Sequence, residues 1–504
     1  MSAPGKSGIG PGGGMRRMRP ARLLIASGLC SALAACSLAP HYERPQLDLP
    51  AAHEPVSAQQ EQSQREAMWR WWRHFDDPVL DRLIDDALAD NLDIALQAAR
   101  VREARAQLGL AQAQFYPTLG AQADATRAKA SLETNPQFSA RERFSTTYSV
   151  AASLGYELNL FSALAGKEAA SARLLTQAWS QDAVRLAVVA DVVANYMSLR
   201  DLRSRIAITQ ATVEADRDNL ALAQARYRFG AIGQLELAQQ RALLASVQDQ
   251  LPRLREQADR LESSLAVLTG RSAREIMNEA PIASAALDRT RVPDALPVLL
   301  PSSLLNQRPD IRAAEAMLVA AGANVSVARA QYFPSLNLGA LIGSAATSLG
   351  NLFGAGTATA SLGAGIGGPI LGFGRIEAGV QTAEAQREQA SIAYRQTVRQ
   401  AFREVRDALR AVDATRERVD TASQTVQAYD ETVRLAQARY DAGMVGLQEV
   451  LDARRRLYGA QINLSDATRD RLVASANLFK ALGGGWNPEE GAAAQVSREA
   501  ASDR

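Results

Sequence analysis

The sequence contains two copies of one pattern. Residues 93–119 align without a gap with residues 310–336, and residues 222–241 match residues 435–454 in the same order. Convergent alanine-rich helices would give scattered matches, but here proline, tyrosine and paired glycine positions also recur. The distance along the sequence between matching residues is nearly the same for both blocks. The chain of 504 residues is therefore predicted to be an internal duplication of a unit of about 215 residues.

Each copy is predicted to contain a helix, two strands, a very long helix, a glycine turn and a further helix. The strands are recognised by alternation of apolar and polar residues, starting at Pro117 and Tyr148 in the first copy and at Ser335 and Thr357 in the second. Each strand therefore has one apolar face. This pattern fits a membrane barrel, and it fits equally a soluble sheet with one solvated face.

The long helices are recognised by a period of seven residues. No proline interrupts residues 164–229 or 374–442. The apolar heptad positions are Val192, Leu199, Ile206, Val213, Leu220 and Tyr227 in the first copy, and Val405, Val412, Val419, Val426, Val433 and Tyr440 in the second. A sustained heptad predicts left-handed supercoiling of partner helices. At 1.5 Å per residue each rod would be about 100 Å long, far beyond a compact domain.

The N-terminus resembles a lipoprotein signal. Arginines precede a short apolar run that ends in Ala34, Ala35 and Cys36, which predicts a signal peptide at residues 1–35. We expect Cys36 to carry a diacylglycerol and an N-acyl chain, and Ser37 favours the outer membrane. An ordinary cleavage site with an incidental cysteine is the alternative. No later apolar stretch is expected to be long enough for a spanning helix.

Strand number then decides how the chain could cross a membrane. In lipid every backbone donor and acceptor must be paired, so strands span only as a closed barrel. Membrane barrels need at least about eight strands, and four cannot close. If these strands span, several copies must share one barrel of eight, twelve or sixteen strands.

The composition disfavours other functions. The 56 basic and 54 acidic side chains give a net charge of +2, which provides no reason to expect nucleic acid as a partner. The three histidines, His41, His53 and His74, lie near the N-terminus, and no Ser/His/Asp or metal-ligand spacing is present. We therefore expect no catalytic residue, no metal site and no cofactor besides the acyl chains. An envelope hydrolase is disfavoured.

Several segments together resemble the TolC-like outer-membrane efflux factors, in particular their NodT-type lipoproteins. They are the LAAC motif ending at Cys36 and residues 40–45, 71–88, 296–315 and both glycine turns. The likeness covers residues 36 to about 485. It implies a mixed α+β membrane protein: a homotrimer whose 12-stranded β-barrel, four strands per protomer, continues as a long α-helical coiled-coil tunnel in the periplasm. It also implies a passive efflux channel that docks with a periplasmic adaptor (membrane fusion) protein and an inner-membrane pump of the RND type.

On this basis the chain divides into six parts. They are the signal peptide at 1–35, the lipidated N-terminal segment and start of the first repeat at 36–92, repeat 1 at 93–295, a linker at 296–309, repeat 2 at 310–485 and a disordered tail at 486–504.

Each long helix ends before a pair of glycines, which permit the positive φ that ends a helix and reverses the chain. In the resembling family, hairpins at this place form the periplasmic tip that meets the adaptor. The candidate adaptor contacts are Gly230, Ile232, Gly233, Gly443, Val445, Gly446 and Leu447. The alternative is a helix-capping turn without a partner.

Just past the second turn, Glu449, Asp452 and Arg455 are spaced by three residues, and Tyr440 precedes the turn. The resemblance places this segment at the constriction of the tunnel, where one acid per protomer makes a ring. These four residues are the candidate gate, and modest cation selectivity is expected. Glu449 departs from the aspartate of some branches, so its part is open. The alternative is a solvated face with an Asp/Arg pair worth about 0 to 1 kcal/mol.

A protein of another class would show much of the same pattern: a lipid-anchored periplasmic coiled-coil scaffold without a pore. The sequence does not identify the transported substrate.

Overall fold

The computed structural model describes residues 44–45, 68–131, 143–278, 305–486 and 491–502, with isolated residues between these ranges. The predicted signal peptide, Cys36 and most of the 296–309 linker lie outside the described residues. The elements of the first half are η1 (Trp71–Phe75), α3 (Pro78–Asp90), α4 (Leu92–Ala113), β1 (Thr118–Lys129), β2 (Phe144–Leu158), α5 (Leu160–Arg228), α6 (Gln234–Gln248), α7 (Gln250–Leu268) and α8 (Ala273–Asn278). Those of the second half are α10 (Pro309–Ala330), β3 (Ser335–Ala346), η3 (Leu349–Asn351), β4 (Ala358–Gly367), α11 (Arg375–Asp441), α12 (Leu447–Ala481) and α13 (Ala492–Ser502).

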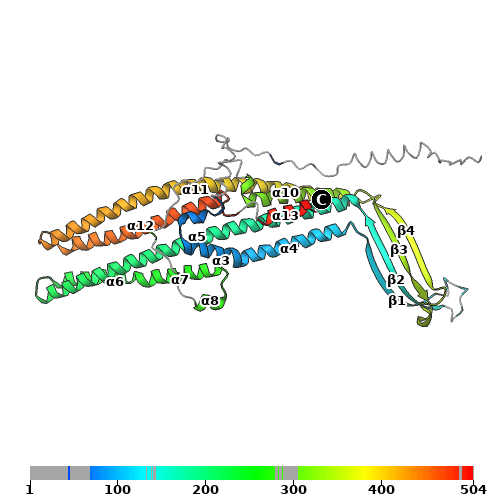
Figure 1. Cartoon of the computed structure of the whole chain (residues 1–504), viewed down its shortest axis with the longest axis horizontal. Coiled ribbons are helices and arrows are strands. Elements are labelled where there is room, and N and C mark those ends of the chain that lie inside the picture. The colour runs from blue at the N-terminus through cyan, green and yellow to red at the C-terminus, as the bar shows by residue number, and fades with distance from the viewer. Residues whose placement is uncertain are drawn as a thin grey trace, which may run out of the picture.

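The four strands form one antiparallel sheet at one end of an elongated molecule (Figure 1). Their order is β1-β2-β3-β4, so β2 and β3 join the two halves of the chain, with Leu158 opposite Leu336. Every residue of β1 and β4 is exposed. The sheet therefore has two open edges, one from each half.

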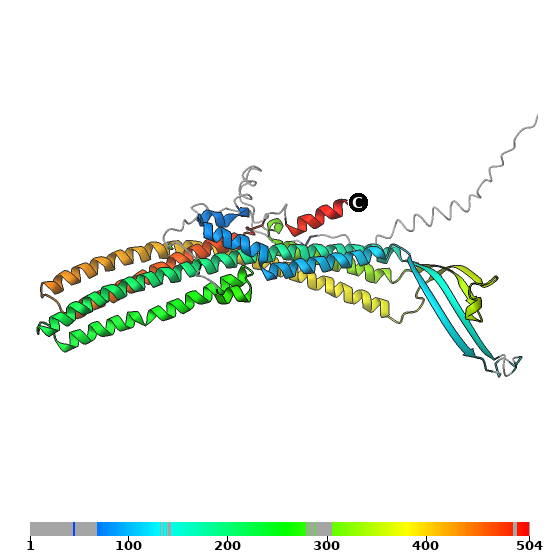
Figure 2. The same ribbon diagram turned by 60° about the horizontal axis from the view of Figure 1, so that its bottom comes forward.

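The two long helices run from the sheet to the opposite end of the molecule. α5 has 69 residues and α11 has 67, which corresponds to about 100 Å each. α5 pairs with α6 and α7, and α11 pairs with α12, so two helical hairpins extend side by side (Figures 1 and 2). Between the sheet and the hairpins, α4 and α10 pack along the long helices.

The largest hydrophobic core lies midway along the molecule, where the N-terminal segment packs against α5 and α12. The rings of Trp71 and Phe479 stack with centroids 5.1 Å apart. Beside them, Nη1 of Arg200 lies 2.7 Å from Oδ2 of Asp77, and the same oxygen accepts the hydroxyl of Tyr196. This core ties both halves and the N-terminal segment together.

The prediction of a disordered tail at residues 486–504 is wrong where the structure describes it, because α13 forms there. The carboxylate of Asp182 on α5 accepts the backbone N–H groups of Ala492 and Ala493 at 3.0 and 3.4 Å. Val496 packs with Leu174 of α5, in a cluster that also includes residues of α4. A cap and an apolar contact therefore hold a segment whose composition alone predicts no order.

Two further elements differ from expectation. The helix after the first glycine turn is divided into α6 and α7 at Asp249, whereas α12 is continuous for 35 residues. α10 is the one helix in the described ranges that is long and apolar enough to cross a membrane, and no such helix was expected. Of the most apolar 18-residue window of α10, 44% is buried. The helix packs against both α5 and α11, so its apolar residues serve helix packing.

Candidate functional site: the tips of the helical hairpins

The first turn lies at the end of the molecule farthest from the sheet. α5 ends at Arg228, and Gly230 has φ +70°. The N–H of Gly230 donates to the carbonyl of Tyr227 at 3.0 Å, and the N–H of Ala231 donates to Arg226 at 2.8 Å. This pair of bonds is the Schellman motif, which requires a residue with positive φ and favours glycine there.

The second turn repeats the first. Gly443 has φ +69°, its N–H donates to Tyr440 at 2.9 Å, and the N–H of Met444 donates to Arg439 at 2.9 Å. The duplication therefore preserves the local geometry at both tips.

The second glycine of each pair has a different role. Gly233 and Gly446 are the N-cap residues of α6 and α12, with φ −84° and −78°. This is ordinary backbone for any residue, and a Cβ at either position would meet nothing within 4 Å in the chain. Glycine is one of several residues that suit an N-cap, but neither the backbone conformation nor the packing within one chain requires it at these two positions.

The other predicted tip residues divide by exposure. Ile232 and Val445 are half-buried. Leu447 is buried in a cluster with Leu243, Leu244 and Leu451, so in this arrangement its side chain supports the tip from inside.

Three exposed apolar residues at the tips were missed. Phe229 is 88% exposed, Leu235 71% and Met444 65%. Apolar side chains at solvent-facing turn positions are the signal that could have identified them. Together they give both turns an apolar surface at the end of the molecule.

The four candidate gate residues do not form one cluster. Asp452 and Arg455 lie together, with Oδ1 3.4 Å from Nη1. Glu449 instead faces α11, where its Oε1 is 3.3 Å from Nη1 of Arg439. Tyr440 packs against Val450 and Ala453, and the guanidinium of Arg226 from α5 lies 5.7 Å from its ring centroid.

The sequence reading also missed partners of these acids. Oδ2 of Asp452 lies 3.7 Å from Nη2 of Arg456, one turn further along α12. Because Glu449 also pairs with Arg439, each of the two acids has at least one arginine within 4 Å. The spacing of four residues between Asp452 and Arg456 is the signal that could have found this pair. The tip of one chain thus presents paired charges, which weakens the expectation of a bare acidic ring and of cation selectivity.

The two hairpins meet at a polar interface next to the candidate gate residues. Thr209 of α5 and Tyr458 of α12 are hydrogen-bonded at 3.0 Å, and Ser465 donates to Asp201 at 2.5 Å. A cavity of about 200 Å³ follows towards the tip. Its lining includes Thr212, Asp216, Leu243, Ser246, Val247, Gln250, Arg454, Arg455 and Tyr458.

Asp216 is the acidic side chain among the residues that line this cavity. Its side chain is buried, and Oδ2 has no hydrogen-bond partner among the described residues. Burial raises the pKa of Asp216, and nearby Arg454 only partly opposes this. Burial also lowers the pKa of Arg454, whose Nη2 donates to Gln437 at 2.8 Å.

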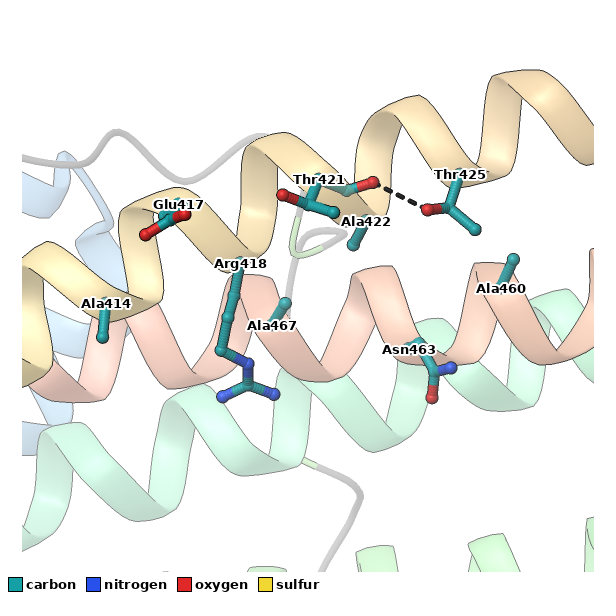
Figure 3. A pocket seen from close by; sticks show the side chains of 9 residues that line it. All are labelled: Ala414, Glu417, Arg418, Thr421, Ala422, Thr425, Ala460, Asn463 and Ala467. Atoms are coloured by element: carbon teal, nitrogen blue, oxygen red, sulfur yellow. Dashed lines mark hydrogen bonds between the residues drawn. The ribbon is translucent and has the colours of Figure 1, made fainter.

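A second groove lies midway along the α11/α12 hairpin (Figure 3). Four alanines, Ala414, Ala422, Ala460 and Ala467, line it together with polar residues. Arg418 crosses from α11 to α12, where Nη1 is 2.8 Å from Oδ2 of Asp470. Small side chains let the two helices approach, and this ion pair links them.

The described residues contain no group of three or more His, Cys, Asp or Glu side chains that could hold a metal ion. Cys36, the predicted lipidation site, lies outside the described residues.

Comparison with known proteins gives consistent matches along the chain. The profile of the outer membrane efflux protein family matches residues 83–271 and 300–484. The pyoverdine export outer membrane protein OpmQ of Pseudomonas putida is 36% identical over 424 residues, which cover 83% of this chain and 89% of that protein. The solvent efflux pump outer membrane protein SrpC of Pseudomonas putida is 32% identical over 461 residues, covering 90% and 96%.

Solved structures agree with the sequence relatives. The CmeC outer membrane channel of Campylobacter jejuni superposes with a TM-score of 0.81 at 26% identity, covering 92% of this chain and 98% of that one. The predicted fold class, with a sheet contributed to a shared barrel and a long helical tunnel, is confirmed by this likeness.

Proposed function

This chain belongs to the outer membrane efflux protein family, and we propose that it forms the outer-membrane channel of a tripartite efflux pump. It is an outer membrane efflux protein by its relatives and its fold. One observation carries the finer proposal. A four-stranded sheet with two open edges continues directly into helical hairpins about 100 Å long.

Three copies form the channel. In lipid the open edges of β1 and β4 would leave a row of unpaired backbone groups, so they must pair with other copies. Three sheets of four strands give a closed 12-stranded barrel, and the six hairpins below it surround the periplasmic tunnel.

The channel conducts passively and is not an enzyme. The groove in Figure 3 is lined by small and polar side chains and contains no histidine or cysteine. The energy for transport comes from an inner-membrane pump of the RND type. Relatives are named for pyoverdine and for solvents, which supports cargo selection by the pump rather than by the duct.

The N-terminal anchor is a diacylglycerol and an N-acyl chain on Cys36, inserted in the outer-membrane lipid. Arg44, eight residues later, supports this arrangement because its guanidinium donates twice to Glu315 of α10, both at 2.8 Å. Eight extended residues reach at most about 28 Å. The segment that connects Arg44 to Cys36 thus starts at α10, the helix that leads into β3, and is long enough to run towards the membrane.

The tips bind the periplasmic adaptor. Open space around Gly233 and Gly446 supports a close backbone approach by another protein. The exposed side chains of Phe229, Leu235 and Met444 supply apolar contact area beside Ile232 and Val445. The first glycines, Gly230 and Gly443, shape the turns, and Leu447 supports them from within.

The gate is a set of ion pairs at the same end. Glu449 with Arg439 links the start of α12 to α11, whereas Asp452 pairs with Arg455 and Arg456 within α12. Tyr440 and Arg226 connect the two hairpins. Opening moves the two hairpins apart and separates Tyr440 from Arg226.

Reconstitution of the acylated chain in planar lipid bilayers tests the proposal. We expect heat-modifiable trimers and single-channel currents, and sensitisation to toxic compounds in a strain that lacks the gene. A monomeric, water-soluble product that gives no current would contradict the channel and favour the lipid-anchored scaffold.

A further inference from the structure

We infer that the far end of the sheet carries a binding site for a phosphorylated lipid headgroup. The site, called the rim site below, consists of Arg127 and Lys129 at the end of β1 and Arg143 just before β2. This inference rests on the proposed channel, because the barrel places one face of the sheet against lipid. It adds a ligand class to the channel.

One face of the β1–β2 hairpin is apolar. Leu119 lies opposite Leu154, and Ala123 lies opposite Val150. Leu119 is 77% exposed, and Leu154 and Val150 are also exposed. Side chains alternate along a strand, so Asp124 lies on the other, more polar face. In the proposed barrel the apolar face meets lipid and the polar face lines the lumen.

The rim site lies at the far end of the apolar face. Arg127 is opposite Thr146 and Lys129 is opposite Phe144. Both cations are an even number of residues from Leu119, so they lie on its face of the sheet. β1 ends and β2 begins at the end of the sheet farthest from the helices (Figure 1). A lipid-facing cation is costly at the bilayer midplane but costs little near an interface, so we place both at headgroup depth.

The ring of Phe144 brings two of the cations together. Nζ of Lys129 lies 5.8 Å from its centroid, and Cζ of Arg143 lies 5.1 Å from it. The N–H of Ala130 donates to the carbonyl of Arg143 at 2.7 Å, which holds the two strand ends in place. Nε of Arg143 is buried and has no acceptor among the described residues. Two like charges therefore share one aromatic ring on a fixed backbone.

No acid balances these charges within the described part of the chain. Arg127, Lys129 and Arg143 form no ion pair there. Glu133, in the turn after β1, is exposed and pairs with none of them. Residues 141–142 are an arginine and a glutamate, which lie outside the described residues and add no net charge. The rim site is thus a cationic group that an anion from outside the chain would neutralise.

The second hairpin of the sheet has no such charges. β1 and β3 have the same length, and Ser344 and Ala346 occupy in β3 the positions of Arg127 and Lys129 in β1. Residues 335–374 include no Asp, Glu, Lys, Arg or His. The duplicated hairpin therefore forms without cations at its end, so the fold does not require them in the first hairpin.

A phosphorylated lipid fits both parts of this face. A guanidinium donates two parallel hydrogen bonds to a phosphate, and an ammonium adds a compact positive charge. The acyl chains of the same lipid would lie along the apolar face, next to Val150 and Leu154. A free phosphate or an acidic peptide would contact the cations alone. The continuity of cationic and apolar surface therefore favours a membrane lipid.

Native mass spectrometry of the acylated oligomer in detergent tests this site, with bisphosphorylated lipid A as the probe. The rim variant combines Arg127→Gln, Lys129→Gln and Arg143→Gln. We expect it to bind the probe at least about tenfold more weakly than the parent, because each cation adds to the attraction of an anionic lipid. Lipid A with a single phosphate should bind the parent more weakly than the bisphosphorylated form.

A control variant removes the same number of charges from α7, an exposed helix that packs against α5 and α6 and not against the sheet. It combines Arg253→Gln, Arg255→Gln and Arg260→Gln, and it should bind lipid A like the parent. Equal losses in the rim and control variants would overturn the site, because they would reflect net charge alone. Displacement of lipid A by an equal concentration of inorganic phosphate would show a site for the free ion and overturn lipid recognition.

A charge-preserving variant keeps the test valid if the rim variant does not assemble. Arg127→Lys with Arg143→Lys retains all three cations and should keep most of the binding. A loss in this variant as large as that expected for the rim variant would overturn the site, as would unchanged binding in the rim variant. If the unaltered chain forms no membrane-inserted oligomer, the proposed channel itself fails, whatever lipid is bound.

Discussion

Asp216 of α5 and Arg454 of α12 line the same small cavity where the two helical hairpins meet, yet Oδ2 of Asp216 has no hydrogen-bond partner among the described residues. Burial raises the pKa of Asp216 and lowers that of Arg454, so each group is less easily charged than in water. A buried carboxylate of this kind makes the contact between the hairpins dependent on pH.

The sign of this dependence follows from linkage. Because the folded pKa of Asp216 is above its unfolded value, the folded chain binds the proton more tightly, and stability falls as pH rises from the unfolded pKa through the folded one. We expect Asp216→Asn to be more stable than the parent above this window, by about 1 kcal/mol per chain. The advantage should shrink as pH falls through the folded pKa.

Thermal unfolding of parent and variant at matched pH values measures this difference, and other titrating groups cancel in it. Asp218→Asn, two residues away on α5 and exposed, is the matched control and should show no such change. A stability difference that is independent of pH, or that grows on acidification, would contradict the assignment.

The gate predicts a change in conductance. Asp452→Ala removes the carboxylate that faces Arg455 and Arg456, leaving two arginines without this partner. We expect a larger single-channel conductance and more frequent openings in planar bilayers. Stability should change by less than about 1 kcal/mol, because the pairs are exposed.

Glu256→Ala is the control for this variant. Glu256 pairs with Arg260 on α7, also exposed and one turn apart, but away from the tip. If Asp452→Ala and Glu256→Ala both have the same conductance as the parent, Asp452 is not part of the gate. Reversal potentials in a salt gradient add a second readout: loss of one carboxylate per protomer should shift the reversal potential towards lower cation preference.

Much of this architecture is predictable from local sequence, and the exceptions share a cause. The proline-free segments 164–229 and 374–442 nearly coincide with α5 (Leu160–Arg228) and α11 (Arg375–Asp441), because heptads and glycines act over neighbouring residues. The cap of α13 comes from Asp182, 310 positions before Ala492, and the partner of Glu449 lies on another helix. No local pattern specifies such contacts, so neither the order of α13 nor the pairing of Glu449 with Arg439 could be predicted from the sequence.

The tail gives a prediction of its own. Asp182→Ala removes both N-terminal acceptors of α13, and loss of a cap costs about 0.5–2 kcal/mol. For a helix of 11 residues this should release α13, so that trypsin can cleave the unfolded backbone after Arg498, whose side chain is already exposed. Mass spectrometry of limited digests measures the cleavage. Asp191→Ala, on an exposed position of α5, should cleave like the parent; equal rates in all three chains would show that the cap does not hold the helix.

Substitutions in the two glycine pairs separate a role in the shape of the turns from a role in contact with the adaptor. Gly230→Ala and Gly443→Ala place a Cβ on residues with φ near +70°, which costs roughly 1–2 kcal/mol each and should lower thermal stability. Gly233→Ala and Gly446→Ala place it on ordinary backbone with open space, so only the preference of an N-cap for glycine over alanine is lost, about 0.5 kcal/mol each. If an adaptor approaches these positions closely, the second pair of variants should nevertheless lose adaptor binding, measured by co-purification or by surface-immobilised titration.

Unchanged binding in Gly233→Ala and Gly446→Ala would show that the tips do not use these glycines for contact. A loss of stability in these two variants as large as in Gly230→Ala and Gly443→Ala would instead show that all four glycines shape the turns.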